Sequence, residues 1–210
     1  MRVNTVLGPA CKRDIGAVAD IFLEAFQDSV RSILGGSMPR TDAVSDLFSF
    51  VLECEPRSFL VSKSDGEVTG YCIALSSLRA LWLKTLFSGV WLRWLVRWAG
   101  GRYTISLGNM LRVVRNKIPF VLSPYNYRAT DAQILSIAVK RGHRGRGLGR
   151  MLLQCALDSL KTRGVKNVKL EVRPDNEAAV RLYTQMGFVE SGRTRDAAGP
   201  WTVMTLDLCT

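Results

Sequence analysis

A glycine-dense turn in the second half of the chain has the residue types of an anion-binding site. Arg144-Gly-Arg-Gly-Leu-Gly149 follows an apolar, β-rich run at 134–139 and precedes a helical period that begins at Leu148. The pattern predicts a strand, a turn and the start of a helix. Glycines leave backbone N–H groups accessible at the positive end of a helix dipole, where phosphate oxygens bind. We therefore expect this turn to hold a phosphorylated ligand.

The turn does not match the common nucleotide-binding loops. A Rossmann fingerprint needs a third glycine where Arg150 stands, and a P-loop needs a Gly-Lys-Ser/Thr sequence that is absent. Arg-Gly repeats also occur in solvated RNA-binding tails. The strand and helix predicted on either side of the turn favour a folded site over such a tail.

A second segment carries a carboxylate and a phenol at positions suited to proton transfer. Residues 168–173 alternate apolar and polar side chains, which predicts a strand with Glu171 on its polar face. Residues 176–186 have a helical period with Tyr183 on the apolar face and Asn176 as a candidate N-cap. Glu171 could accept a proton and Tyr183 could donate one. A solvated glutamate and a core tyrosine would show the same pattern.

Both segments resemble motifs of the GCN5-related N-acetyltransferase (GNAT) superfamily. Arg144-x-x-Gly147-x-Gly149 resembles the family's Arg/Gln-x-x-Gly-x-Gly/Ala loop. The downstream segment resembles its Asn-x-x-Ala-x-x-Leu-Tyr-x-x-x-Gly-Phe motif at Asn176, Ala179, Leu182, Tyr183, Gly187 and Phe188. The resemblance covers residues 131–208 well, where it is greatest to ribosomal-protein N-terminal alanine acetyltransferases. It implies an α/β fold with a mixed, mainly antiparallel sheet, helices on both faces and a centre splayed for the cofactor.

The resemblance also implies roles for individual residues. Members of the family pass an acetyl group from acetyl-coenzyme A to a primary amine by direct attack on the thioester, without an acyl-enzyme. Glu171 would deprotonate the amine and Tyr183 would protonate the coenzyme A thiolate. The cofactor would be bound by Ile137, Ala138, Val139, Arg144, Gly145, Arg146, Gly147, Leu148, Gly149, Arg150, Asn176 and Tyr183. No metal is expected, and the lone histidine, His143, is interpreted as a solvated loop residue.

The acceptor amine is predicted from a departure from the family pattern. The N-terminal acetyltransferases usually carry a Tyr-Tyr segment after the phenylalanine, whereas this chain has Ser191-Gly-Arg-Thr-Arg-Asp196. Because a basic, Trp-rich segment at 78–128 would suit such ligands better, we favour an amino sugar or a lipid-linked saccharide as acceptor, with a protein N-terminus as the alternative. An alternative of another class is a non-catalytic coenzyme-binding domain that binds nucleic acid or a membrane surface.

The remaining pattern predicts the elements around these segments. The first 75 residues predict two helices, two strands and an Asp65-Gly66 hairpin turn between the strands. The helices span 14–26, with Asp14 as candidate cap, and 41–53, and the strands span 58–63 and 68–75. Strands at 189–193 and 201–208 would complete the sheet. We expect one domain over residues 1–210.

Residues 78 to about 128 form an insertion relative to the family plan, which has a short turn there. Leu78–Trp98 predicts one helix that carries four tryptophans, and Leu107–Lys117 predicts a second. Nine basic residues and no acidic residue lie between Glu67 and Asp131. The arginines argue against a helix that spans a bilayer. The insertion could pack on its own domain, form a homodimer or lie on an anionic membrane surface. Nucleic acid is less favoured because the tryptophans crowd one helix.

Composition limits the class of protein and its compartment. The chain has 210 residues, 47% of them hydrophobic, and a net charge of +11. Its five cysteines form no Cys-x-x-Cys pair, and an odd number argues against a disulfide framework. The Val6-Leu7 patch is too short for a signal peptide. We expect a cytoplasmic protein, peripheral at the inner membrane face if the insertion binds lipid.

Overall fold

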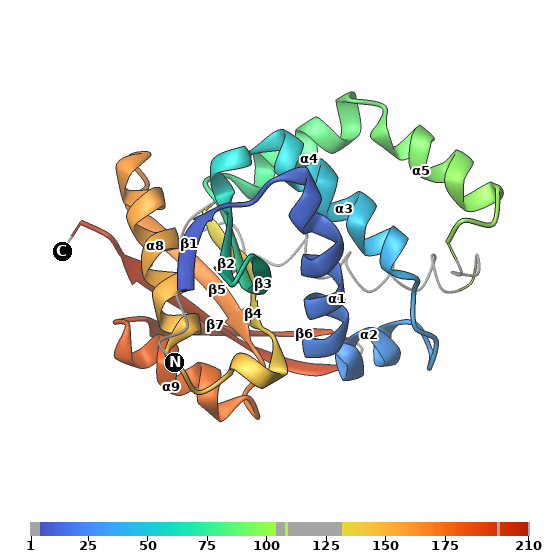
Figure 1. The fold of residues 1–210 in the computed structure, drawn as a ribbon. Coiled ribbons are helices and arrows are strands. Elements are labelled where there is room, and N and C mark those ends of the chain that lie inside the picture. The colour runs from blue at the N-terminus through green and yellow to red at the C-terminus, as the bar shows by residue number, and fades with distance from the viewer. Residues whose placement is uncertain (1–4, 104–107, 109–131, 197, 210) are drawn as a thin grey trace.

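A seven-stranded sheet in the order β1-β2-β3-β4-β5-β7-β6 runs through the molecule (Figure 1). The computed structural model describes residues 5–103, 108, 132–196 and 198–209. All neighbouring strands are antiparallel except β4 and β5, which confirms the predicted mixed sheet. The strands are β1 (Thr5–Pro9), β2 (Phe59–Ser64), β3 (Glu67–Leu75), β4 (Gln133–Val139), β5 (Asn167–Val172), β6 (Val189–Asp196) and β7 (Gly199–Asp207).

Helices cover both faces of the sheet, as predicted (Figure 1). The described helices are α1 (Ile15–Ala25), α2 (Gln27–Ile33), α3 (Thr41–Cys54), α4 (Leu78–Phe87), α5 (Val90–Ala99), α8 (Leu148–Thr162) and α9 (Glu177–Gln185). Short 3-10 turns lie at Lys12–Asp14, Pro56–Ser58 and Arg141–His143. α1 and α3 pack on one face around Phe59 and Tyr71. α8 and α9 pack on the other around Leu170 and Phe188.

The local sequence explains most of these elements. Asp65 and Gly66 have φ values of 51° and 85°, as the predicted hairpin turn requires. The apolar positions of α8 recur at helical spacing, and Leu152, Leu153 and Leu160 are fully buried. Asp14 does not cap α1 with its side chain. Its carboxylate instead accepts from the Cys11 N–H (2.9 Å) and pairs with Lys63 (2.7 Å).

The predicted single helix at 78–98 is wrong, because the structure has two helices there. α4 ends at Phe87, and Gly89 adopts a left-handed conformation (φ 65°) ahead of α5. A residue without a Cβ tolerates that conformation, so Ser88-Gly89 forms a corner. No helix among residues 5–103 or the later described segments is long and apolar enough to cross a bilayer. The helix predicted at 107–117 lies outside the described residues, apart from Gly108, which is helical.

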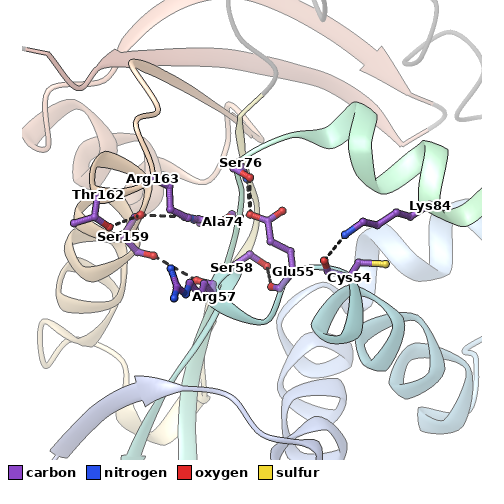
Figure 2. A network of polar contacts seen from close by, with 10 residues as sticks. All are labelled: Cys54, Glu55, Arg57, Ser58, Ala74, Ser76, Lys84, Ser159, Thr162 and Arg163. Atoms are coloured by element: carbon purple, nitrogen blue, oxygen red, sulfur yellow. Dashed lines mark hydrogen bonds and ion pairs between the residues drawn. The ribbon is translucent and has the colours of Figure 1, made fainter.

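A polar network joins the ends of three elements where the insertion leaves the core (Figure 2). The Arg163 guanidinium, just after α8, pairs with Glu55 after α3 and donates to the Ala74 carbonyl of β3 (3.1 Å). Glu55 also accepts from the N–H and hydroxyl of Ser76 (2.9 and 2.8 Å). Lys84 of α4 donates to the Cys54 carbonyl (2.6 Å). The network therefore sets the direction in which the chain enters α4.

α5 is attached to α3 through local contacts of one side. The Trp94 ring meets Phe50 of α3 edge to face, with ring centroids 5.6 Å apart. Arg97 and the Tyr103 hydroxyl both bind the Asp46 carboxylate of α3. These contacts partly support the prediction that the insertion packs on its own domain.

Candidate active site

The centre of the sheet opens between its two parallel strands. β4 and β5 pair only at Gln133 with Lys169 and at Ile134 with Leu170. Beyond Ile134, β4 stays paired with β3, while β5 stays paired with β7. The two halves of the sheet therefore separate after two residue pairs, and this leaves β4 residues 135–139 with a free edge toward β5.

Backbone direction places amide groups in this opening. The Lys140 N–H donates to the Thr69 carbonyl on the β3 side (2.8 Å). Since the backbone groups of successive residues in a strand point to opposite sides, the N–H groups of Val139 and Ile137 point toward β5. Ala138, by the same argument, faces β3, and its side chain lies in the core under α1. The opening is thus lined by donors at alternate residues.

The glycine turn lies at the carboxyl end of β4, as the sequence predicts. Gly145 and Gly147 adopt left-handed conformations (φ 75° and 77°), and Gly147 is the N-cap of α8. The first helical hydrogen bond runs from the Met151 N–H to the Gly147 carbonyl (3.1 Å). The three preceding N–H groups, of residues 148–150, have no acceptor inside the helix. They form the positive end of a fifteen-residue helix.

The arginines of the turn lie in different environments. Arg144 folds back so that its Nε donates to the Val139 carbonyl (2.9 Å) at the end of β4. Arg146 is exposed. Arg150 bonds to the Gln185 side chain of α9 (2.6 Å). Arg144 thereby ties the turn to β4, and Arg150 ties α8 to α9.

Tyr183 lies under the sheet on the face covered by α8 and α9. It is 7% exposed, and its ring centroid is 6.0 Å from that of Phe188. Burial raises the pKa of the Tyr183 phenol far above its ordinary value, and the Cys72 thiol adds to the increase. Cys72 of β3 is opposite Ile137 of β4 in the sheet. Tyr183 and Cys72 belong to one apolar cluster, and Ile137 of β4 packs against it beside the opening.

Glu171 approaches the same opening from the other face. It is the first residue of β5 after the last pair with β4, and it is partly buried. Leu170 and Val172 pack under α8 and α9, so Glu171 points to the opposite face. Lys169, on the same face as Glu171, is 2% exposed, although its type suggests a solvated position. The candidate acid and base thus lie on opposite sides of the splayed strands.

A cluster beside Glu171 was not anticipated from the sequence. Arg173 donates to both Asp196 oxygens (2.8 and 3.1 Å), and its guanidinium stacks 4.0 Å from the centroid of the Trp201 ring. Desolvation of Asp196 raises its pKa, but hydrogen bonds from Trp201 and Arg173 outweigh it and lower the pKa overall. The cluster fixes the β6–β7 turn near the end of β5. No local pattern links residues so far apart in sequence.

Two further predicted positions are described by the structure. The Asn176 side chain accepts from the Ala179 N–H (3.2 Å) and so caps α9. His143 lies in the 3-10 turn before Arg144 and is partly exposed. Among the described residues, no three His, Cys, Asp or Glu side chains form a group that could hold a metal ion.

A family model matches most of the chain. The model of the acetyltransferase (GNAT) family matches residues 22–188, which include both candidate motifs and the opening between β4 and β5. The chain belongs to the GNAT acetyltransferase family. The predicted resemblance and fold class are thereby confirmed.

Individual GNAT relatives are similar over shorter segments. A [ribosomal protein bS18]-alanine N-acetyltransferase from Salmonella typhimurium is 49% identical over 61 residues, which are 29% of this chain and 41% of that protein. A streptothricin acetyltransferase from Streptomyces lavendulae is 41% identical over 70 residues, which are 33% and 35% of the two chains. The chain thus spans about two fifths or less of the length of these relatives. Their names differ in the acceptor, so the similarity does not select one.

Solved GNAT structures share the fold along almost the whole chain. SsHAT superposes with a TM-score of 0.71 over 98% of each chain at 21% identity. The yncA acetyltransferase from Salmonella typhimurium, solved with its cofactor acetyl-CoA, superposes with a TM-score of 0.60 at 20% identity over 97% and 94% of the two chains. At such identities the comparison concerns the fold alone.

Proposed function

We propose that the protein transfers an acetyl group from acetyl-coenzyme A to the nitrogen of a primary amine. The observation that carries the proposal is the separation of β4 from β5 beside a glycine turn that presents helix N–H groups. In the proposed complex, the backbone N–H groups of residues 148–150 and of the glycine turn bind the pyrophosphate. The Ile137 and Val139 amides bind the pantetheine arm and the acetyl carbonyl. The thioester then lies between Tyr183 and Glu171.

The proposed reaction needs no acyl-enzyme. The neutral amine attacks the thioester carbon, the C–S bond breaks as the tetrahedral intermediate collapses, and the amide forms. Glu171, directly or through water, takes the proton that the amine loses. Tyr183 gives a proton to the departing thiolate. Backbone N–H groups of β4 stabilise the negative charge on the carbonyl oxygen.

The high pKa of Tyr183 is compatible with this role. At neutral pH the phenol stays protonated, so it can act as a proton donor but not as a base. Burial also raises the pKa of the neighbouring Cys72 thiol. A coenzyme thiolate in the same desolvated region would likewise be a stronger base than in water. Proton transfer from phenol to thiolate is then less unfavourable than the raised phenol pKa alone suggests.

Two acceptor classes follow from different observations. An amino sugar, either on a nucleotide or on a lipid-linked saccharide, is supported by the charge of +11 and by residues 191–196, which contain two arginines and no tyrosine. Arg195 is exposed on β6, beside the Arg173 and Asp196 cluster. A protein N-terminus is supported by the bS18-alanine relative. We favour the amino sugar, because the phosphates of its nucleotide or lipid carrier suit a basic surface.

A thiol-release assay tests the reaction and the acceptor together. Full-length protein, acetyl-coenzyme A and one amine per well are followed by the appearance of free thiol, with amino-sugar nucleotides and Ala- or Ser-initiated peptides in parallel. We expect release with amino sugars, and a loss of about 10²-fold or more in kcat for Glu171→Gln. Glu177→Gln, on the exposed surface of α9, is the control for loss of a carboxylate and should keep full turnover.

The outcomes separate the proposals. Turnover with peptides alone would overturn the amino-sugar acceptor and leave acetyl transfer standing. Acetyl-coenzyme A binding without turnover on any amine would favour a non-catalytic coenzyme-binding domain. Full activity of Glu171→Gln would remove Glu171 as the base.

A further inference from the structure

The α4–α5 hairpin leaves one apolar face uncovered. Seven large apolar side chains of these two helices are each more than half exposed: Trp82, Leu83, Leu86, Phe87, Trp91, Leu92 and Val96. Phe87, at the corner between the helices, is 79% exposed. We call this set the hairpin face. So large a group of exposed apolar side chains is unusual on a monomeric protein and marks an interaction surface.

The orientation of the hairpin face is set by contacts on the other side of the same helices. Trp94 and Arg97 of α5 bind Phe50 and Asp46 of α3. At 100° per residue, Leu92 and Val96 lie on the side of α5 away from these two, and Trp91 lies about 60° from Trp94, between the two sides. Leu81 of α4 packs against the core beneath α1 and α3. The hairpin face is therefore the outer side of an anchored hairpin and is not needed for that packing.

The charged residues of α4 and α5 are all basic. No acidic residue occurs between Glu67 and Asp131, whereas nine basic residues do. Arg97 and Arg102 lie near Asp46 and Asp42 of α3, which offset their charges. Arg93 is exposed and follows Leu92 directly on α5. An apolar face with an exposed arginine beside it complements a partner that has a negatively charged surface over an apolar interior.

Other occupants fit these features less well. A second copy would bring the same two helices, whose charged residues are all basic, against themselves, and like charges oppose such a contact. Nucleic acid bases would stack on the three aromatic rings, but the four leucine and valine side chains of the hairpin face neither stack on bases nor bind phosphate. The two helices have ten residues each, which is about 15 Å at 1.5 Å per residue, half the hydrocarbon thickness of a bilayer. They can lie in a bilayer surface but not cross it.

We propose that the hairpin face docks on the surface of an anionic lipid bilayer. Phe87 and the Trp82 and Trp91 rings enter the boundary between headgroups and acyl chains, and Arg93 lies among the lipid phosphates. The hairpin leaves the sheet after Leu75, which is opposite Gln133 at the start of β4. The glycine turn follows the other end of β4. Figure 1 shows the hairpin and the glycine turn at opposite ends of the molecule. Docking would thus leave the coenzyme entrance open to water.

Vesicle cosedimentation tests the proposal independently of acetyl transfer. Full-length protein is mixed with vesicles of equal parts phosphatidylglycerol and phosphatidylcholine, or of phosphatidylcholine alone, in low and high salt. We expect binding to the anionic vesicles that weakens in high salt. Phe87→Ser/Trp91→Ser should weaken it by about tenfold or more, and Arg93→Glu by several-fold. Arg97 is unsuitable for this test because it holds α5 on α3.

A control variant loses the same number of exposed apolar side chains elsewhere on the surface. Val6→Ser/Val189→Ser removes two side chains that are 60% and 64% exposed on edge strands, and it should bind vesicles like the wild type. Unchanged thermal unfolding of each variant shows that the fold is intact. In vesicles of brominated lipid, quenching of tryptophan fluorescence in the wild type would support insertion.

Three results would overturn the proposal. One is the absence of binding to phosphatidylglycerol vesicles in low salt, and another is equal binding by the wild type and Phe87→Ser/Trp91→Ser. The third is a wild-type dimer in solution that the same double substitution dissociates, which would assign the hairpin face to a second copy.

Discussion

The hydroxyl of Tyr183 can be removed without disturbing the packing of its ring. Tyr183→Phe keeps the contact with Phe188 and the apolar cluster beneath the sheet. If the phenol protonates the coenzyme thiolate, kcat should fall by about 10²- to 10³-fold, while the KM for acetyl-coenzyme A stays within about twofold. Steady-state thiol release measures both parameters.

Tyr103→Phe is the matched control for loss of a phenol. Its hydroxyl binds Asp46 on the α3 side of the insertion, away from β4 and β5. We expect it to lower the melting temperature slightly and to leave turnover unchanged. Wild-type kcat in Tyr183→Phe would make the tyrosine a core residue only, and another group or water would have to supply the proton.

At the residue scale, the candidate catalytic residues could be predicted from their types and spacing, but the side chains that they contact could not. Glu171 and Tyr183 could be chosen because a carboxylate and a phenol occur in a family-like order. That they lie on opposite faces at one opening depends on the two-residue contact of β4 with β5. Arg173 illustrates the limit, since its partners Asp196 and Trp201 lie on other strands. Sequence periodicity reports which face a side chain takes but not what it meets.

The turn before α8 can be tested through the backbone of one glycine. Gly147 has φ 77° and open space where a Cβ would lie, so an alanine there would be opposed by conformation alone. Such strain is about 1–2 kcal/mol for an L-residue, and it should shift the turn away from the geometry that binds pyrophosphate. We expect Gly147→Ala to raise the KM for acetyl-coenzyme A by about five- to thirtyfold, with little change in kcat.

Gly164 offers the same substitution at the other end of α8. Its φ is 76°, and it too has no atom within 4 Å of the added Cβ. Gly164→Ala should destabilise the fold about as much as Gly147→Ala and leave the KM unchanged. Equal KM values for the two variants, measured by thiol release and supported by melting temperatures, would argue that the turn does not hold the coenzyme.

At the element scale, helices and strands with a regular apolar period were predicted correctly, whereas the break between α4 and α5 was not. The strands and helices at 58–75 and 133–187 lie within a residue or two of their predicted bounds, because their apolar patterns are regular. β1 and α2 were missed because Thr5–Pro9 is short, with only Val6 and Leu7 marking it, and Gln27–Ile33 is largely polar. The helix at 78–98 was predicted unbroken because apolar residues flank Gly89 on both sides. The left-handed conformation of Gly89 is visible only in the fold.

The whole molecule depends on how the two halves of the sheet are held while their centre is open. The β-bulge in β4, where Ile73 is opposite Ser136 and Ala74 opposite Ile134, is one such feature. The Glu55 and Arg163 pair is another, since it connects the end of α3 on one face to the end of α8 on the other. No sequence pattern predicts either, because each joins segments that are distant along the chain. The family resemblance predicted the splay itself, but not these supports.

The pair of Glu55 and Arg163 should therefore contribute more to stability than an exposed ion pair. Their side chains are 21% and 15% exposed, and Arg163 also binds the Ala74 and Ser159 carbonyls (3.1 and 3.0 Å). Arg163→Met leaves the partly buried Glu55 carboxylate without its cationic partner. We expect a loss of about 2 kcal/mol in the free energy of unfolding. The melting temperature should fall by about 4–8 °C for a chain of this size.

Arg181→Met is the control, because it breaks a solvated i,i+4 pair with Glu177 and should cost about 0.5 kcal/mol or less. A double-mutant cycle with Glu55→Gln isolates the pairing from the other bonds of Arg163. Denaturant unfolding of the four proteins gives the coupling free energy, which we expect to be about 1 kcal/mol or more. A coupling near zero would mean that Arg163 acts through the Ala74 and Ser159 carbonyls alone. The two faces of the sheet would then be joined at this end by backbone contacts, with the ion pair contributing nothing measurable.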